Sequence, residues 1–218
     1  MLLSAKKFPL RKWYQADTAK SYFWLGRVQS EAGDLTGALE SVQLSLRLRK
    51  QFLGDHPDTA DDLHEQGVIH YRMGDHKSAV EAFQKAADMN LNFRGEHIFT
   101  AHSYHSLGVA RNTMADLTGA LDSFQRAANM RSRVLGDHDD TASSNHQLGL
   151  VQRDMGDLEG AWDSWQRAAN IRSRVLGDHE GTAYCYYLLG LVQRHMGDLE
   201  GAWDSLQRAA KHEITCAW

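Results

Sequence analysis

The chain has 218 residues, a formal net charge of -4 with 24% charged residues of both signs, and only two prolines and two cysteines. A small net charge of mixed sign does not indicate a basic surface that would bind nucleic acid. Two cysteines are too few for a disulfide framework. No apolar run approaches the roughly 20 residues that a membrane helix needs. We therefore expect a soluble, cytoplasmic protein with no nucleic-acid partner and no membrane insertion.

Two residue types recur with a constant spacing of 41 positions along the chain. The threonines are Thr18, Thr59, Thr100, Thr141 and Thr182, and the glycines eight positions later are Gly26, Gly67, Gly108, Gly149 and Gly190. A fixed period of this length predicts repeats that pack on their neighbours. We expect five units in residues 17–218, beginning near these threonines, and an N-terminal cap or the remnant of a preceding repeat in residues 1–16.

Each unit is predicted to contain two helices, which are clearest in the fourth. The first helix should span Thr141 to Met155, with the threonine hydroxyl as its N-cap. Gly156 suits the left-handed position that ends a helix, and Asp157 should cap a second helix that extends to Leu176. In the third unit Ala115 replaces this glycine, and a left-handed alanine is strained by about 1 kcal/mol. We therefore expect this turn to be looser or differently wound.

Packing positions follow from the helical spacing of apolar residues in the second helix of each unit. A glycine matching Gly149 occurs in every unit, although glycine within a helix costs about 1 kcal/mol relative to alanine. We therefore expect the two helices of a unit to approach closely, with Gly149 facing Ala161. Trp162, Trp165 and Trp203 are predicted to lie on the buried stripe rather than in a ligand site.

The twelve histidines raise the question of metal-dependent chemistry. His64 and His70 are six residues apart, which turns a helix by about 600° and places the imidazoles on different faces. His102 and His105 share a helical turn, but a third ligand is not evident. We therefore predict no metal site, no cofactor and no catalytic residue.

The pattern Leu148-Gly149, Gly156, Ala161, Trp165, Ala168 resembles the tetratricopeptide repeat. The long second helix and the loop Leu53 to Ala60, LGDHPDTA, are similar to the kinesin light chain and nephrocystin-3 type of this repeat. The resemblance covers all five units. It implies an all-α, right-handed superhelical solenoid of five helix-turn-helix repeats with a 41-residue period.

In that family the first helices line a concave groove, and their fifth position often carries a ligand-holding asparagine. The matching position here and its inward neighbours form the predicted peptide-binding set: Phe23, His64, Val68, Tyr71, His105, Val109, Asn112, His146, Leu150, Arg153, Tyr187, Leu191 and Arg194. An apolar floor with two guanidinium groups suits a peptide with apolar and acidic residues. Binding through the histidines would depend on pH, because imidazole ordinarily titrates near 6.5.

The resemblance thus implies a non-enzymatic scaffold or adaptor that binds a protein segment in the groove. The alternative is that these inward residues form a purely structural face. A second hypothesis is self-association, in which uncapped ends join copies into a homo-oligomer or belong to a longer repeat array.

Overall fold

We describe residues 7–177 and 179–216 of a computed structural model, with side chains for residues 15–177 and 179–211. The chain forms two compact units, Met1–Gly95 and Glu96–Trp218. The described parts of both units consist of helices and short turns, with no strand. The prediction of an all-α fold is confirmed for these residues.

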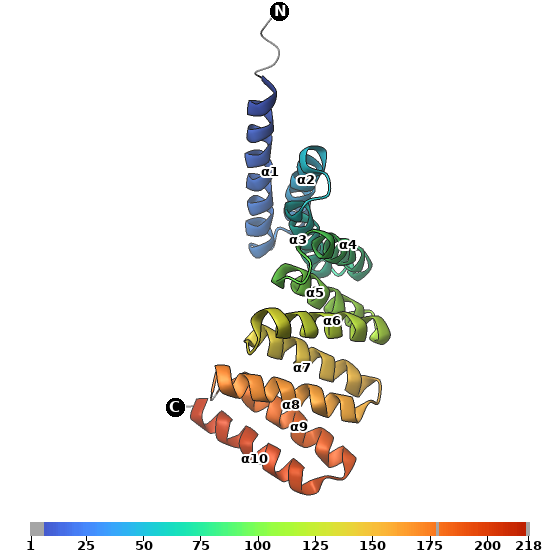
Figure 1. The fold of residues 1–218 in the computed structure, drawn as a ribbon, viewed down its shortest axis with the longest axis vertical. Helices are drawn as coiled ribbons and strands as arrows, with labels where there is room; N and C mark the ends of the chain where they lie inside the picture. Colours follow the sequence, from blue (N-terminus) through green and yellow to red (C-terminus); the bar gives the residue numbers. More distant parts are fainter. Residues whose placement is uncertain (1–6, 178, 217–218) are drawn as a thin grey trace, which may run out of the picture. The chain divides into compact units, whose positions relative to one another are not determined.

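Consecutive helices pack against each other within each unit (Figure 1). The first unit contains α1 (Lys7–Glu31), α2 (Leu35–Leu53), α3 (Pro57–Arg72) and α4 (His76–Arg94). The second unit contains α5 (Ile98–Thr113), α6 (Leu117–Leu135), α7 (Asp139–Asp154), α8 (Leu158–Val175), α9 (Glu180–Met196) and α10 (Leu199–Cys216). Odd-numbered helices are the first helix of a repeat and even-numbered helices are the second. Of the predicted cap, residues 1–6 lie outside the described residues, and residues 7–16 form the beginning of α1.

The turns that carry a Gly-Asp pair form as the sequence predicts. Gly156 has a positive φ of 83°, and the Asp157 side chain accepts a hydrogen bond from the Gly160 amide as the N-cap of α8. The expectation of a looser or differently wound turn in the third unit is wrong, because Ala115 adopts the same left-handed conformation, with φ 60°. The amide of Asp116 still donates to the carbonyl of Arg111, as the amide of Asp157 donates to Gln152. The alanine therefore retains the common turn geometry in a conformation strained for a residue with a side chain.

The loop between repeats differs from our prediction, because histidine rather than threonine is the N-cap. Nδ1 of His138 accepts a hydrogen bond from the amide of Asp140 at 3.1 Å, and α7 begins before Thr141. His56, His97 and His179 cap α3, α5 and α9 in the same way. Thr59, Thr100, Thr141 and Thr182 are instead buried in the first turn, where they contribute to packing.

The recurring glycine permits the close approach that we predicted, but with a different partner. A methyl group added to Gly149 would lie 2.6 Å from the indole Nε1 of Trp165, rather than facing Ala161. The same added carbon at Gly67 or Gly108 would collide with the ring of Phe83 or Phe124. Glycine is therefore required because a large side chain from the second helix covers its backbone.

The prediction for the tryptophans is right for one residue and wrong for two. Trp165 is 1% exposed in the core. Trp162 is 37% exposed and Trp203 is 69% exposed. Trp162 lies three residues before the covered Trp165 and points toward the edge of the helix contact, because three residues turn a helix by about 300°.

Candidate functional site

The predicted peptide-binding residues lie on the first helices of the repeats and are divided between the two units. Phe23 lies on α1, and His64, Val68 and Tyr71 lie on α3 of the first unit. The remaining positions lie on α5, α7 and α9 of the second unit: His105, Val109, Asn112, His146, Leu150, Arg153, Tyr187, Leu191 and Arg194.

In the first unit, the predicted aromatic residues contact side chains of their own unit. The rings of His64 and Phe83 have centroids 5.1 Å apart, and those of Tyr71 and His76 are 5.0 Å apart. The guanidinium group of Arg49 lies 5.1 Å from the centre of the Phe23 ring. These three predicted residues are half-buried, so they contribute to packing as well as to the surface.

His105 in the second unit belongs to a polar cluster between α5, α6 and α7. Arg131 donates a hydrogen bond to the Ser144 hydroxyl at 2.8 Å, and that oxygen lies 3.2 Å from Nδ1 of His105. This geometry allows the hydroxyl to donate to an unprotonated Nδ1. Burial lowers the pKa of His105 to about 3, and the nearby charge of Arg131 contributes to this lowering. The imidazole is therefore neutral at physiological pH.

His146 occupies the matching position between α7, α8 and α9. Its Nδ1 lies 3.9 Å from the sulfur of Cys185, to which Arg172 donates at 3.4 Å. Burial and then the charge of Arg172 lower the pKa of His146 to about 4. Our expectation that these histidines make binding titrate near pH 6.5 is therefore wrong for His105 and His146.

A set of recurring arginines at the repeat junctions was not predicted. We call them the arginine anchors: Arg49, Arg131 and Arg172. Each lies on a second helix and donates to a backbone carbonyl in the first turn of the next helix. The acceptors are the carbonyls of Asp58, Asp140 and Gly181. The signal was present in the sequence, because Arg131 and Arg172 are 41 positions apart and Arg49 precedes Arg131 by twice that spacing.

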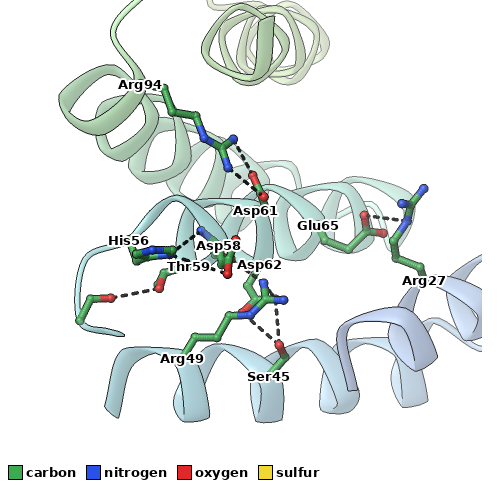
Figure 2. A network of polar contacts seen from close by, with 11 residues as sticks. Arg27, Ser45, Arg49, His56, Asp58, Thr59, Asp61, Asp62, Glu65 and Arg94 are labelled. Atoms are coloured by element: carbon green, nitrogen blue, oxygen red, sulfur yellow. Dashed lines mark hydrogen bonds and ion pairs between the residues drawn. The ribbon is translucent and has the colours of Figure 1, made fainter. Parts of the chain in front are cut away.

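The anchor in the first unit is a buried ion pair, shown in Figure 2. Arg49 lies 2.9 Å from Asp62, whose carboxyl also accepts a hydrogen bond from Ser45 at 2.9 Å. Asp62 is fully buried. Burial raises the pKa of Asp62 to about 7, although Arg49 and Ser45 both act to lower it. This arrangement fixes α2 against α3, and the second unit uses neutral Ser144 and Cys185 at the matching position.

A hollow of about 330 Å³ lies between α7, α8 and α9 of the second unit. Leu158, Trp165, Leu188, Leu191 and Val192 supply its apolar lining, and Arg153 and His195 supply its polar lining. Arg153 and Leu191 belong to the predicted set, and the structure brings them to one hollow. The other lining residues were not predicted as binding residues, because their spacing marks them as helix-packing positions.

The remaining predicted residues of the second unit do not line this hollow. Val109 and Leu150 pack against the buried core as partly buried side chains. Tyr187 is 44% exposed and stacks on Tyr184, with ring centroids 6.3 Å apart. Arg194 is exposed on the last turn of α9. Among these remaining residues, Tyr187 thus presents an exposed aromatic ring and Arg194 an exposed guanidinium group, both on α9.

The described residues contain no group of three or more histidine, cysteine or acidic side chains that could hold a metal ion. Within the same residues, no helix is both long and apolar enough to cross a membrane.

The tetratricopeptide repeat family model matches residues 17–92, 99–163 and 140–212, so the chain belongs to this family. Members of this fold class generally mediate protein–protein interaction. No curated protein sequence matches the chain. The family-model matches confirm the resemblance to the tetratricopeptide repeat.

Solved structures with the same fold include proteins of the kinesin light chain type. A kinesin light chain-like protein with nearly identical repeats from Podosopora anserina has a TM-score of 0.77 and 18% identity, covering 93% of this chain and 97% of its own. BtubC (BKLC) from P. vanneervenii has a TM-score of 0.81 and 18% identity, with coverages of 96% and 84%. MamA has a TM-score of 0.71 and 21% identity, with coverages of 92% and 94%. At these identities the likeness shows the fold alone.

Proposed function

We propose that the chain is a non-enzymatic adaptor whose second unit binds a segment of a partner protein across α7 and α9. The observation that carries the proposal is the apolar hollow between α7, α8 and α9. A largely apolar hollow with a few polar groups at its edge suits an inserted side chain whose neighbours make directional contacts.

The chemistry of the lining indicates what the partner segment should contain. Leu158 and Leu191, which are partly exposed in the hollow, offer contact to a leucine-sized or aromatic side chain, and burial of such a group contributes about 1.5–3 kcal/mol. Arg153 lines the same hollow, and guanidinium groups bind carboxylates well. The partner segment is therefore expected to carry an apolar anchor residue beside an acidic residue.

Fluorescence anisotropy with labelled peptides tests this proposal. The probes are short acidic peptides that differ only at the centre, which is leucine, tryptophan or serine. We expect the leucine or tryptophan peptide to bind at least about tenfold more tightly than the serine peptide, since loss of about 1.4 kcal/mol is a tenfold change. Equal binding of all three peptides, or no binding, would refute the proposed anchor.

Matched variants locate the binding site. Leu191→Asp and Arg153→Ala should each weaken the bound peptide. Val175→Asp and Arg167→Ala make the same kinds of change at exposed positions on α8 outside the hollow. These two control variants should leave the affinity unchanged, and a comparable loss with the controls would show that binding is a nonspecific effect of charge.

A further inference from the structure

Repeat junctions within each unit use a constant set of apolar positions. In the α6/α7 junction, Phe124 of α6 and Leu148 and Val151 of α7 are at most 4% exposed and belong to one core cluster. Leu117 and Leu121 of α6 pack against this cluster. In the α2/α3 junction, Val42 and Ile69 occupy the matching positions, and both are fully buried. The second helix of one repeat thus offers one apolar face, and the first helix of the next repeat covers it.

The same face of α10 is uncovered among the described residues. Leu206 lies 82 positions, or two repeats, after Phe124, and it is 36% exposed where Phe124 is 0% exposed. Leu199 and Trp203 match Leu117 and Leu121 by the same spacing, and they are 68% and 69% exposed. We call these three residues, Leu199, Trp203 and Leu206, the α10 face. The α10 face has the composition of a repeat junction, and no helix within the described residues covers it.

The complementary half of the junction is exposed on α1. Val28 lies 41 positions before Ile69, and it is 61% exposed where Ile69 is 0% exposed. Leu25 lies 123 positions, or three repeats, before Leu148, and it is 47% exposed where Leu148 is 4% exposed. Trp24, beside them in the sequence, is 50% exposed. Leu25 and Val28 form what we call the α1 face, which has the positions that a preceding second helix covers elsewhere.

We propose that the occupant of the α10 face is the α1 face of a second copy of this chain, packed in the register of the α6/α7 junction. Each copy carries both halves of a junction that is already formed inside its own units, so the two faces match in position and in apolar character. Burial of these leucine, valine and tryptophan side chains provides the driving force. The two faces differ, so the contact is head-to-tail and joins copies into open chains.

The contact between copies should be weaker than a junction within a unit. Inside the units, the arginine anchors hold the first turn of the next helix. The position 41 residues after Arg172 is Glu213, so the arginine of the anchors does not recur there in the sequence. We therefore expect association that depends on protein concentration. This inference uses faces other than the hollow and stands independently of the proposed function.

Sedimentation velocity of the full chain tests the proposal over about a hundredfold range of concentration. Val28→Glu places a charge in the α1 face and Trp203→Glu places one in the α10 face. Both positions are largely exposed, so these variants should fold, which circular dichroism checks. Val134→Glu changes a residue of α6 that is 43% exposed and lies outside both faces, and it serves as the matched control.

We expect wild type and the Val134→Glu control to gain mass with concentration, and each face variant alone to keep the mass of one chain. An equimolar mixture of the two face variants should form a dimer and nothing larger, because the mixture retains one intact pair of faces. Wild type that keeps the mass of one chain throughout would overturn the proposal. So would association of Val28→Glu alone, because that result would show α10 faces pairing with each other, and so would a mixture that fails to form the dimer.

Discussion

His105 and His146 are buried, neutral imidazoles with lowered pKa values, whereas their positions in the sequence suggested groups that titrate near pH 6.5. Both lie at the column where the family often has asparagine, and both face a polar atom of the next repeat, Ser144 or Cys185. Burial keeps them neutral, because it penalises the charged imidazolium form. They serve as hydrogen-bonding groups at repeat junctions, and their protonation is linked to folding rather than to binding near neutral pH.

This linkage predicts a change in acid stability. An unfolded histidine takes up a proton below about pH 6.5, whereas folded His105 and His146 have pKa values of about 3 and about 4. The unfolded state therefore binds more protons, and stability from these groups is lost as pH falls from about 6.5 toward about 4. Asp62 acts in the opposite direction, since its raised pKa costs stability as pH rises toward about 7.

The measurement compares the free energy of urea unfolding between pH 6 and pH 4 for wild type and His105→Asn. Replacing His105 should reduce the slope of the unfolding free energy against pH by up to about 1.4 kcal/mol per pH unit. The difference between the two proteins is the quantity tested, because the Asp62 contribution is common to both. Identical slopes would contradict the neutral, buried state of His105.

At the scale of helices, the repeat junction depends on the arginine anchors. In the α2/α3 junction, Asp62 is fully buried beside Arg49, which is 9% exposed. Removing one partner of a buried ion pair leaves the other charge without compensation. The second unit contains a natural comparison, in which Arg131 donates to the neutral Ser144 at the position of Asp62.

Asp62→Ala should destabilise the first unit by about 3 kcal/mol, because it strands the Arg49 guanidinium. Asp62→Ser reproduces the arrangement of Arg131 with Ser144, so it should cost only about 1 kcal/mol. Urea unfolding at pH 7.5 measures both. A serine variant no more stable than the alanine variant would show that the hydroxyl cannot replace the carboxylate at this junction.

Much of the helix architecture was predictable because it rests on local rules with a 41-residue repetition. Gly156 and Asp157 mark the turn, and the structure confirms both. The N-cap was mispredicted because a histidine ring reaches the first turn as the hydroxyl of a threonine would, and His138 takes that role. The burial of Trp203 was mispredicted because it depends on whether another helix packs against that position. The spacing of residues within a repeat gives no information on this.

The hollow was only partly predictable for a related reason. Arg153 and Leu191 follow from the inward column of the repeat. Leu158 and Trp165 come from the second helix, where apolar spacing indicates packing whether or not a gap remains beside them. A cavity depends on the volumes of side chains from three helices, and no spacing in one helix encodes those volumes.

At the scale of the whole molecule, different residues determine the repeat frame and the surface that the frame presents. The neighbours with this fold share only 18–21% of their residues with it, so the repeat frame tolerates wide variation in side chains. Glycines, caps and arginine anchors maintain that frame. We propose that the exposed residues of α7 and α9, with the hollow that they border, determine which partner binds.

Amide hydrogen exchange of the full chain, with and without the tightest-binding leucine or tryptophan peptide, tests this central claim most directly. Our account predicts slower exchange in α7 and α9, around Leu150–Arg153 and Leu188–Arg194, with no change for the serine-centred peptide. Protection confined to α6 and α10, or to the loops between repeats, would contradict it.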